Sequence, residues 1–478
     1  MFQLPADCLN EIIEYLEYDN ATLHSCLLVN RFWCKVSVRI LWRNIQNYKT
    51  IISCLPNESK ELLNKNKIVI STFNSKTPLF NYVSFIKYLS IYNINNIIKS
   101  ILQNFQSITP QSLNHKKYIV AMEIYKLIMS QTSLRELYLN LYNMIDTPII
   151  TFISYPGAIN CLKYLTKLSC HSDIYPGFFY QLSYLCHNIQ YLDISFEKMI
   201  SDGLSELIFV QKNLKYLKIY NYNCEDSINI IQSLSKLPNT IIKCEIYGVI
   251  HYIPLTFITK IINLKELVLS FHTYTYNSNN FKYFEKLQYI TFTQLEILKF
   301  PVACPRVEVL IKFLENNGKN LKEFYICCSD NSLCLAVAKF CPNLRKFFST
   351  GYIELELLKK IFNGCQYLES INIWCDDNYK DVWDIITKYS PRNFYKLKLY
   401  YSMSTKSGKF SKELEKFFIN WKNRLPLSFI IEGFNLEIME MIEKYKKLVF
   451  GNHCLCYTHQ DLLIEKYSEN LARIALYR

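Results

Sequence analysis

The chain has 478 residues, of which 50% are hydrophobic and 20% are charged. This length exceeds the ~250–300 residues at which one hydrophobic core stops growing, so it argues against a single compact globule, and the apolar content argues against disorder throughout. The formal net charge is +13, but lysines are spread along the chain without a basic run, so nucleic acid is not an expected partner.

The first 45 residues predict three short helices. Residues 4–16 have one apolar face at helical spacing, and Pro5 suits a helix start because its missing N–H costs nothing there. A second helix is expected after Asn20 as its N-cap, and a third across residues 33–45. A helical unit this small needs a partner or an adjoining domain for stability.

The N-terminal residues contain neither the basic segment nor the apolar stretch of a secretory leader. No apolar run approaches the ~18–20 residues that span a bilayer, so no membrane association is expected. The 18 cysteines follow no disulfide framework. We therefore expect reduced cysteines in a chain that works in the cytoplasm, the nucleus or both.

Beyond residue 80 the apolar pattern L-x-x-L-x-L recurs within the ~20–29-residue period of leucine-rich repeats. Clear copies begin at Ile86, Leu134, Ile189, Leu214, Leu264, Leu321, Leu368 and Phe394, and weaker copies begin at Leu165, Ile241, Leu287 or Leu295, and Leu344. The gap between Ile86 and Leu134 equals about two periods, so one degenerate repeat is expected between them.

Alternating apolar residues bury one face of a short strand, and the segments between strands have helical periodicity. Each strand–helix unit leaves an apolar face that only a neighbouring unit covers, so the units stack. The sequence predicts an α/β fold, a leucine-rich-repeat solenoid curved as a horseshoe, whose concave face carries aromatic and charged residues of the interface-forming kind. The candidate target-binding residues on that face are Tyr138, Tyr191, Tyr216, Lys218, Tyr220, Tyr325, Trp374, Lys398 and Tyr400.

Residues 4–45 resemble the F-box-like domain. The matching residues follow the family patterns L-P-x-E/D-x-L-x-x-I-x-x-x-L, V-x-R-x-W and L-W; they are Leu4, Pro5, Asp7, Leu9, Ile12, Leu16, Val29, Arg31, Trp33, Leu41 and Trp42. The sequence departs from the family at Asn30, where Cys is common, and at Phe32. The resemblance covers about a tenth of the chain.

Three repeats begin Cys-x-x-L/I, at Cys186, Cys341 and Cys365, and so look like the cysteine-containing class of leucine-rich repeats, which is commonly paired with an N-terminal F-box. The paired resemblance implies the substrate receptor of an SCF-type cullin–RING ubiquitin ligase. Its F-box would bind the S-phase-kinase-associated adaptor protein and through it a cullin scaffold, while the repeats bind a protein substrate. The residues expected to bind the adaptor are Leu4, Pro5, Leu9, Ile12, Val29, Trp33, Leu41 and Trp42.

Catalytic motifs are not found in the sequence: it has no G-x-S-x-G, no Gly-rich phosphate loop and no H-E-x-x-H. The best metal candidate is the segment from His453 to His459, which includes Cys454 and Cys456 but lacks a second spaced pair of ligands. We therefore expect no metal, no cofactor and no catalytic activity of the chain itself.

Four segments are expected: an F-box-like domain over residues 1–46, a connecting helical segment over 47–80, the repeat solenoid over 81–450 and a C-terminal cap over 451–478. Two alternatives stay open beside the ligase receptor. One is a protein-binding scaffold, or a nucleic-acid-associated repeat protein, whose N-terminal helices only cap the repeats; the other is an enzyme. Apolar residues at the outer positions of the N-terminal helices favour a bound partner over a cap.

Overall fold

The computed structural model describes most of the chain between residues 5 and 445. The described residues are 5–68, 78–103, 109–139, 152–197, 199–221, 227–249, 254–272, 281–328, 330–375, 379–401, 407–421, 424–432, 440 and 444–445. Leu4, the segment from His453 to His459 and the expected cap over 451–478 lie outside them. Contacts divide the chain into two compact units, Met1–Leu214 and Lys215–Arg478.

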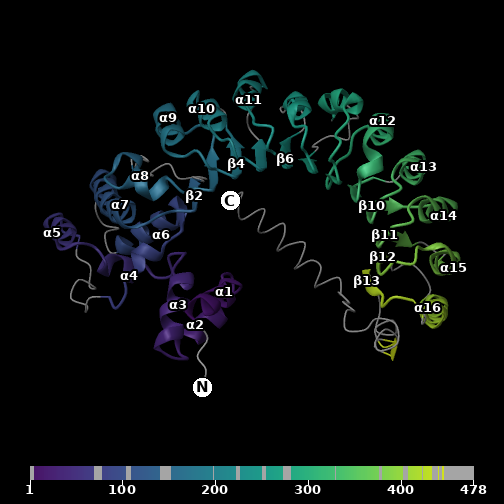
Figure 1. Ribbon diagram of the computed structural model, residues 1–478, viewed down its shortest axis with the longest axis horizontal. Helices are drawn as coiled ribbons and strands as arrows, with labels where there is room; N and C mark the ends of the chain where they lie inside the picture. The colour runs from purple at the N-terminus through teal and green to yellow at the C-terminus, as the bar shows by residue number, and fades with distance from the viewer. Residues whose placement is uncertain are drawn as a thin grey trace. The chain divides into compact units, whose positions relative to one another are not determined.

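The first unit begins with three helices, α1 (Ala6–Glu14), α2 (Asn20–Leu27) and α3 (Arg31–Leu41), which lie together in Figure 1. Two of them are capped by side chains: Asp19 accepts a hydrogen bond from the amide of Thr22 at 3.0 Å, and Asn30 accepts from Phe32 and Trp33 at 2.9 and 3.0 Å. Such caps satisfy amides that a helix start leaves unpaired. The expected cap at Asn20 is therefore wrong by one residue.

In the described residues of the next stretch, five further helices and the first two strands follow. They are α4 (Tyr48–Ser53), α5 (Asn57–Lys65), η2 (Tyr82–Phe85), β1 (Tyr88–Ser90), α6 (Ile91–Ile101), α7 (Pro110–Gln131) and β2 (Glu136–Leu139). Strand β1 pairs directly with β2 in parallel, with Leu89 opposite Leu137. Because the described residues between these strands form helices and no strand, the expected degenerate repeat is wrong. The long helix α7 enlarges one repeat instead.

The rest of the first unit is regular. Its elements are η4 (Phe152–Ser154), α8 (Ala158–Leu162), β3 (Lys167–His171), α9 (Pro176–Leu185), β4 (Tyr191–Phe196) and α10 (Gly203–Phe209). Strands β1 to β4 are parallel and lie side by side in chain order. This arrangement follows from the repeat, since each strand needs a crossover before the next parallel strand.

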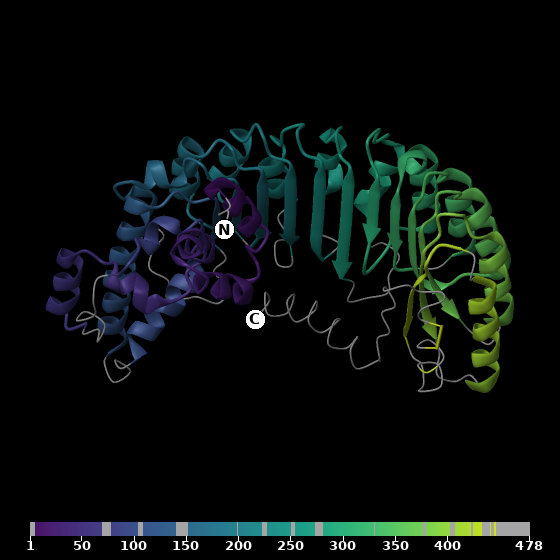
Figure 2. The ribbon, with the colours of Figure 1, turned by 60° about the horizontal axis from the view of Figure 1, so that its bottom comes forward.

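The second unit contains nine described strands, parallel and adjacent in chain order, seen broadside in Figure 2. They are β5 (Tyr216–Asn221), β6 (Lys243–Val249), β7 (Glu266–His272), β8 (Ile297–Phe300), β9 (Glu323–Ile326), β10 (Lys346–Tyr352), β11 (Ser370–Cys375), β12 (Lys396–Tyr401) and β13 (Ser428–Glu432). The register of β8 selects Leu295 over Leu287 as the start of its repeat. Strand β13 lies within the predicted repeat region but belongs to a copy that the sequence pattern did not reveal.

Helices connect these strands and cover one face of the sheet. They are α11 (Ser227–Leu234), η5 (Leu255–Lys260), η6 (Lys282–Tyr289), α12 (Val307–Asn317), η7 (Gly318–Asn320), α13 (Asn331–Phe340), α14 (Leu355–Gly364), α15 (Tyr379–Tyr389) and α16 (Ser407–Trp421). Figure 1 shows α12 to α16 along one side of β10 to β13. The α/β leucine-rich-repeat architecture predicted from the sequence is therefore confirmed in each unit, whereas a horseshoe shape stays a prediction.

The core lies between strands and helices. Register pairs place the central apolar residues of successive strands in one row, and Leu298, Phe324, Phe347, Ile371 and Leu397 in that row are at most 1% exposed. The strand residues between the buried ones are partly exposed, as in β8 and β9. We call the side of the strands that carries these alternate residues the open face. Among the described residues, no helix combines the length and apolarity needed to cross a membrane.

Candidate functional site

The residues expected to bind an adaptor separate into two groups by burial. Leu9, Leu41 and Trp42 are 0%, 3% and 8% exposed, because they form the core between the first three helices and the segment that follows. Ile12 and Val29 are 49% and 57% exposed, Pro5 is exposed and Trp33 is partly buried. Leu9 stands among the residues expected to bind the adaptor, but its side chain is fully buried. The adaptor-binding role of the set stays a prediction.

The exposed residues are joined by further apolar side chains that the sequence patterns did not single out. Tyr15, at the C-terminal end of α1, is 90% exposed, and Leu28, just after α2, is 87% exposed. We call Ile12, Tyr15, Leu28 and Val29 the exposed apolar set. Such side chains gain roughly 1.5–3 kcal/mol each when a partner covers them fully. The helical segment thus has solvent-exposed apolar side chains that a partner protein can cover.

Arg43 fastens the three helices to the first strand. Its guanidinium pairs with Glu14 and, at 2.6 Å, with Glu17, and the Tyr88 hydroxyl of β1 also donates to Glu17. Burial of the Glu17 carboxylate acts to raise its pKa. The hydrogen bonds from Tyr88 and Arg43 outweigh burial and hold that pKa below its ordinary value. The Arg43 carbonyl accepts from the amides of Lys87 and Tyr88 at 2.9 and 3.1 Å. The helices and β1 are therefore one packed structure.

The open face of the first unit brings two predicted target-binding residues together. The Lys167 ammonium lies 5.2 Å from the ring centre of Tyr138 and 5.0 Å from that of Tyr191, and 3.2 Å from the carboxylate of Glu136. The Tyr138 hydroxyl donates to Glu136. Cations over aromatic faces are attracted by the ring quadrupole. This cluster is fixed by its own contacts, so the two tyrosines are held in place before any target arrives.

The open face of the second unit carries an alternating row of charges across β5 to β10, which we call the charge ladder. Each carboxylate lies between two ammonium groups. Glu245 contacts Lys243 at 2.8 Å and Lys218 at 4.0 Å, Glu266 contacts Lys243 at 3.2 Å and Lys299 at 3.5 Å, and Glu323 contacts Lys346 at 2.6 Å and Lys299 at 3.8 Å. Three carboxylates thus neutralise most of four lysines, which does not favour a phosphate backbone on this face.

The charge ladder shifts the pKa values of its members in the directions that stabilise it. Burial acts to raise the pKa of Glu245, but the hydrogen bond and charge of Lys243 lower it overall. The hydrogen bond that the Lys346 ammonium donates to the Glu323 carboxylate is the main cause of the raised pKa of Lys346. Burial raises the pKa of Tyr325 to about 12, so its hydroxyl stays protonated at neutral pH.

Aromatic rings stack beside the ladder. Tyr220 and Tyr247 stack with centres 5.1 Å apart, and the Lys218 ammonium lies 5.0 and 5.1 Å from their ring centres. Tyr325 stacks on Phe348 at 4.0 Å. The predicted residues Tyr216, Lys218, Tyr220 and Tyr325 are all partly exposed, as expected for the open face. Lys398 is partly exposed, Trp374 is 40% exposed, and the side chain of Tyr400 lies outside the described residues.

Sequence reasoning did not single out five charged residues of the ladder: Lys243, Glu245, Glu266, Lys299 and Lys346. A signal for them was present. Strand register places Lys243, Glu266 and Lys346 in the same row as Tyr216 of β5. It places Glu245 and Lys299 in the same row as Lys218 of β5. Extending the register of the clear repeats to the weaker ones would have placed all five on the open face.

The cysteines of the repeats serve packing. The 14 cysteines whose side chains the structure describes are free thiols. The Cys186 thiol donates to the carbonyl of Leu162 at 3.3 Å, and the Cys365 thiol donates to that of Val337 at 3.8 Å, each one repeat earlier. Burial raises the pKa of both thiols to about 12. Such protonated, buried thiols are poor nucleophiles.

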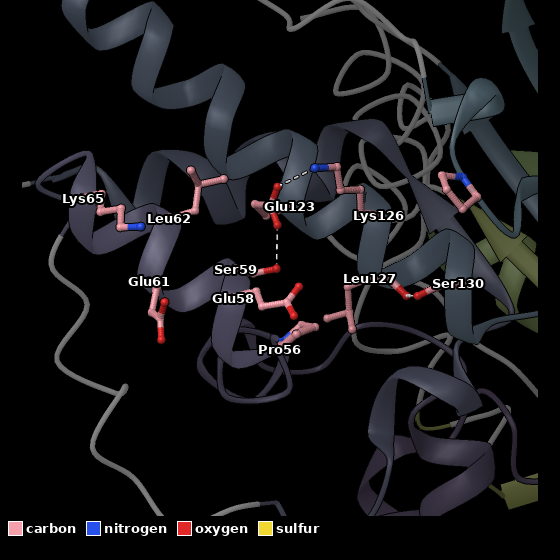
Figure 3. A pocket seen from close by; sticks show the side chains of 11 residues that line it. Pro56, Glu58, Ser59, Glu61, Leu62, Lys65, Glu123, Lys126, Leu127 and Ser130 are labelled. Atoms are coloured by element: carbon pink, nitrogen blue, oxygen red, sulfur yellow. Dashed lines mark hydrogen bonds and ion pairs between the residues drawn. The ribbon is translucent and has the colours of Figure 1, made fainter.

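A pocket of about 650 Å³ lies between α5 and α7 (Figure 3). The Glu123 carboxylate in its wall is 4% exposed, accepts from Ser59 at 2.5 Å and pairs with Lys126 at 2.9 Å. These bonds tie the two helices and leave the buried charge compensated. Within the described ranges, no group of three or more His, Cys, Asp or Glu side chains is placed to hold a metal ion.

No model of a protein family matches the sequence, and no curated protein matches it. The fold is similar to the crystal structure of the Rad7 and Elc1 complex in yeast, with 13% identity, a TM-score of 0.39 and coverage of 78% of this chain and 89% of that chain. It is also similar to the TLR13–ssRNA13 complex, with 12% identity, a TM-score of 0.32 and coverage of 65% and 43%. A leucine-rich-repeat protein of Leptospira interrogans matches with 15% identity, a TM-score of 0.31 and coverage of 74% and 94%. TM-scores this low say nothing of partners or activity.

Proposed function

We propose that the chain is a non-catalytic substrate receptor of an SCF-type cullin–RING ubiquitin ligase. In this proposal the first three helices bind the S-phase-kinase-associated adaptor protein, which links them to a cullin scaffold, and the repeats bind a protein target for ubiquitination. The observation that carries the proposal is the exposed apolar set on a segment whose sequence matches the F-box-like patterns. Such a receptor works in the cytoplasm or the nucleus and needs no cofactor.

The exposed apolar set supports docking rather than simple capping. A cap that ends a repeat stack needs a polar outer face. Here Tyr15 and Leu28 have at least 87% of their surface in water, and Ile12 and Val29 about half. Surface of this kind marks protein–protein contacts when it gathers on one small unit.

The attachment through Arg43 supports a receptor whose helical segment is held rigidly on its first repeat. Because the Arg43 carbonyl caps the amides of β1 and its guanidinium holds α1, the helices cannot swing freely about residues 43–88. A ligase needs such stiffness, since ubiquitin transfer depends on the positions of reacting groups.

A protein-binding scaffold is the second candidate, and the same Arg43 contact favours it. Successive repeats share one bonding pattern, in which a carbonyl accepts from two consecutive amides of the next repeat, as the Lys265 carbonyl does from Glu296 and Ile297 at 2.8 and 2.9 Å. The Arg43 carbonyl accepts in the same way from the amides of Lys87 and Tyr88, so Arg43 stands where a preceding repeat would be. The helices thus complete the repeat ladder, which is what a cap does.

Capture of the purified adaptor by the full chain tests the proposal against the scaffold. Ile12→Asp combined with Val29→Asp should abolish capture, because each places a charge in an apolar contact. The matched control is Ile159→Asp, at a residue of α8 that is 64% exposed, comparable with Ile12 and Val29. Capture by the wild type and the control but not by the double variant supports the receptor. No capture by the wild type, or equal capture by all three, contradicts it.

A further inference from the structure

We propose that Cys304 and Cys327 are a redox-sensitive pair, which forms a reversible disulfide between two successive repeats when a low-molecular-weight disulfide oxidises the chain. The inference concerns a site that the proposed function does not use, and it applies to a ligase receptor and to a scaffold alike. It is carried by a cluster of three thiols, those of Cys304, Cys327 and Cys328, which come from neighbouring repeats of the second unit.

The fold brings the three cysteines together at one end of two neighbouring strands. Cys304 lies in the connection from β8 to α12, while Cys327 and Cys328 follow β9 directly, in the connection to α13. The last residues of the two strands, Phe300 and Ile326, lie opposite each other in the parallel register, and strands paired in this way are roughly 4.7–4.9 Å apart. Helices α12 and α13 also lie side by side (Figure 1). The register thus brings cysteines that are distant in sequence within reach of one another.

The three thiols contact one another. The Cys304 thiol is hydrogen-bonded to the thiols of both Cys327 and Cys328. The hydroxyl of Ser349 on β10 donates to the Cys328 carbonyl at 3.0 Å and so holds the backbone beside the cluster. All three cysteines are free and partly exposed, which leaves them accessible to a small reagent. Sulfur atoms in hydrogen-bond contact need only small side-chain rotations to reach the S–S bond length of ~2.05 Å.

Backbone geometry favours a disulfide between the two repeats over one between adjacent residues. Cys327 and Cys328 are joined by a trans peptide bond, which holds consecutive Cα atoms ~3.8 Å apart. Disulfides usually join Cα atoms that are ~4.4–6.8 Å apart. The bond therefore connects Cys304 to the segment that follows β9. Within that segment Cys327 is the partner, because the hydrogen bond between Cys304 and Cys327 is the largest single influence on the pKa of each of these two thiols.

The cluster keeps these two thiols protonated at neutral pH. The hydrogen bond with Cys327 acts to lower the pKa of Cys304, but the hydrogen bond with Cys328 and burial outweigh it and raise that pKa to about 12. The hydrogen bond with Cys304, followed by burial, raises the pKa of Cys327. Because the thiolate is the reactive form, oxidation at neutral pH is slow. The pair therefore stays reduced where oxidant is scarce and cross-links under sustained oxidation.

The reaction is a thiol–disulfide exchange in two steps. The thiolate of one cysteine attacks a sulfur of the oxidant, forms a mixed disulfide and releases half of the oxidant as a thiolate. The thiolate of the other cysteine then attacks the protein sulfur of that mixed disulfide and releases the second half. The two cysteines lose two electrons and two protons, and the oxidant gains them as two thiols. The product is a covalent link between repeats that are otherwise held by non-covalent contacts.

Oxidised glutathione added to the reduced full chain tests the inference. After the remaining thiols are alkylated, digestion with trypsin places Cys304 in the peptide of residues 300–306 and both Cys327 and Cys328 in the peptide of residues 323–339. Mass spectrometry under non-reducing conditions should find these two peptides joined, and a reductant should separate them. Absence of the joined peptides, or glutathione attached to separate cysteines without a joined pair, would overturn the inference.

Serine variants identify the pair. Cys304→Ser and Cys327→Ser should each lose the joined peptides, whereas Cys328→Ser should keep them. The matched control is Cys54→Ser, at a cysteine that is likewise partly exposed but lies outside the cluster, and it should also keep them. An undiminished yield from Cys327→Ser, or loss of the joined peptides in Cys328→Ser, would overturn the pairing. Melting curves of the reduced variants, and alanine in place of serine, check that each chain is folded.

Melting temperatures measure what the bond does to the repeats. The disulfide closes a loop of about 24 residues, which lowers the conformational entropy of the unfolded chain. We expect the oxidised wild type to melt at least ~2 °C above its reduced form. Oxidised Cys327→Ser should melt at the same temperature as reduced Cys327→Ser. An oxidised wild type that melts no higher than the reduced chain would contradict a bond that forms without distorting the two repeats.

Discussion

Arg43 and Tyr88 are joined twice, once through the backbone and once through a shared carboxylate. The Arg43 carbonyl accepts from the Tyr88 amide at 3.1 Å, and both side chains bind Glu17. Because Arg43 follows α3 and Tyr88 begins β1, these contacts fix the three helices to the first strand. The proposed adaptor-binding segment is thus packed onto the first repeat of its own unit.

Arg43→Ala should destabilise the first unit. The substitution leaves Glu14 and Glu17 without the guanidinium that compensates them, in a site where the Arg43 side chain is 10% exposed. We expect a loss of about 1–3 kcal/mol in the free energy of unfolding, since uncompensated, partly buried charges are costly. Denaturant unfolding followed by circular dichroism measures the loss.

The control for Arg43 is Arg306→Ala. Arg306 pairs with Glu285 at 2.6 Å, but the two side chains are 54% and 42% exposed. Exposed pairs contribute about 0–1 kcal/mol, so this variant should be close to the wild type. Equal losses for the two variants would mean that the Arg43 network does not fasten the helices.

Stability should fall with pH in the acidic range. The pKa of Glu245 is lowered below its ordinary value of 4.5 in the folded chain, so the folded state keeps a charge that the unfolded state loses. Its contribution is therefore present above the unfolded pKa and is lost as the pH falls below that value. Glu245→Gln should melt at a lower temperature than the wild type at neutral pH, and the two melting temperatures should converge in acid.

Glu356→Gln is the control for the pH experiment, since Glu356 is 75% exposed and lies 3.8 Å from Lys359. This variant should follow the wild type at every pH, as exposed pairs contribute little. A Glu245 variant that keeps a constant offset from the wild type down to strong acid would contradict the account of the ladder.

Leu9→Ala should weaken the fold of the helices and not merely their contact with a partner. Leu9 is 0% exposed within the core of the first unit. Truncating a buried leucine costs about 2–5 kcal/mol. Ile12→Ala, at a residue that is 49% exposed, should cost much less stability. Thermal melting of the two variants compares them, and equal melting temperatures would place Leu9 outside the core.

The thiols should be free along the whole chain. None of the 14 cysteines with described side chains forms a disulfide, and the sequence contains 18 in all. Reaction with a thiol reagent under denaturing, non-reducing conditions should count close to 18 thiols per chain. Several missing thiols would indicate disulfides and contradict the expected cytoplasmic or nuclear location.

Sequence reasoning found most strands because their apolar residues alternate and the repeat period is regular. It placed Leu267, Phe324 and Leu397 in the core, and all three are fully buried. It failed between β1 and β2, where the helix Pro110–Gln131 occupies the length of a repeat without adding a described strand. Periodicity alone cannot say whether a long apolar segment adds a repeat or enlarges one.

The candidate sites were predicted less completely than the fold. The F-box-like patterns named both Leu9 and Ile12, although one is buried and the other exposed. A family pattern records which residues recur and does not separate core from contact. The charge ladder was missed because it depends on pairs such as Lys243 and Glu266, which are distant in sequence and adjacent only through strand register.

Titration of the purified adaptor into the full wild-type chain by calorimetry tests the central claim most directly. We predict saturable one-to-one binding with a dissociation constant in the micromolar range or tighter, about −8 kcal/mol or more favourable. The change in heat capacity should be negative, because the exposed apolar set would be buried. Absence of measurable heat and of co-elution at high micromolar concentrations of both proteins would contradict the ligase role and leave the repeats as a scaffold.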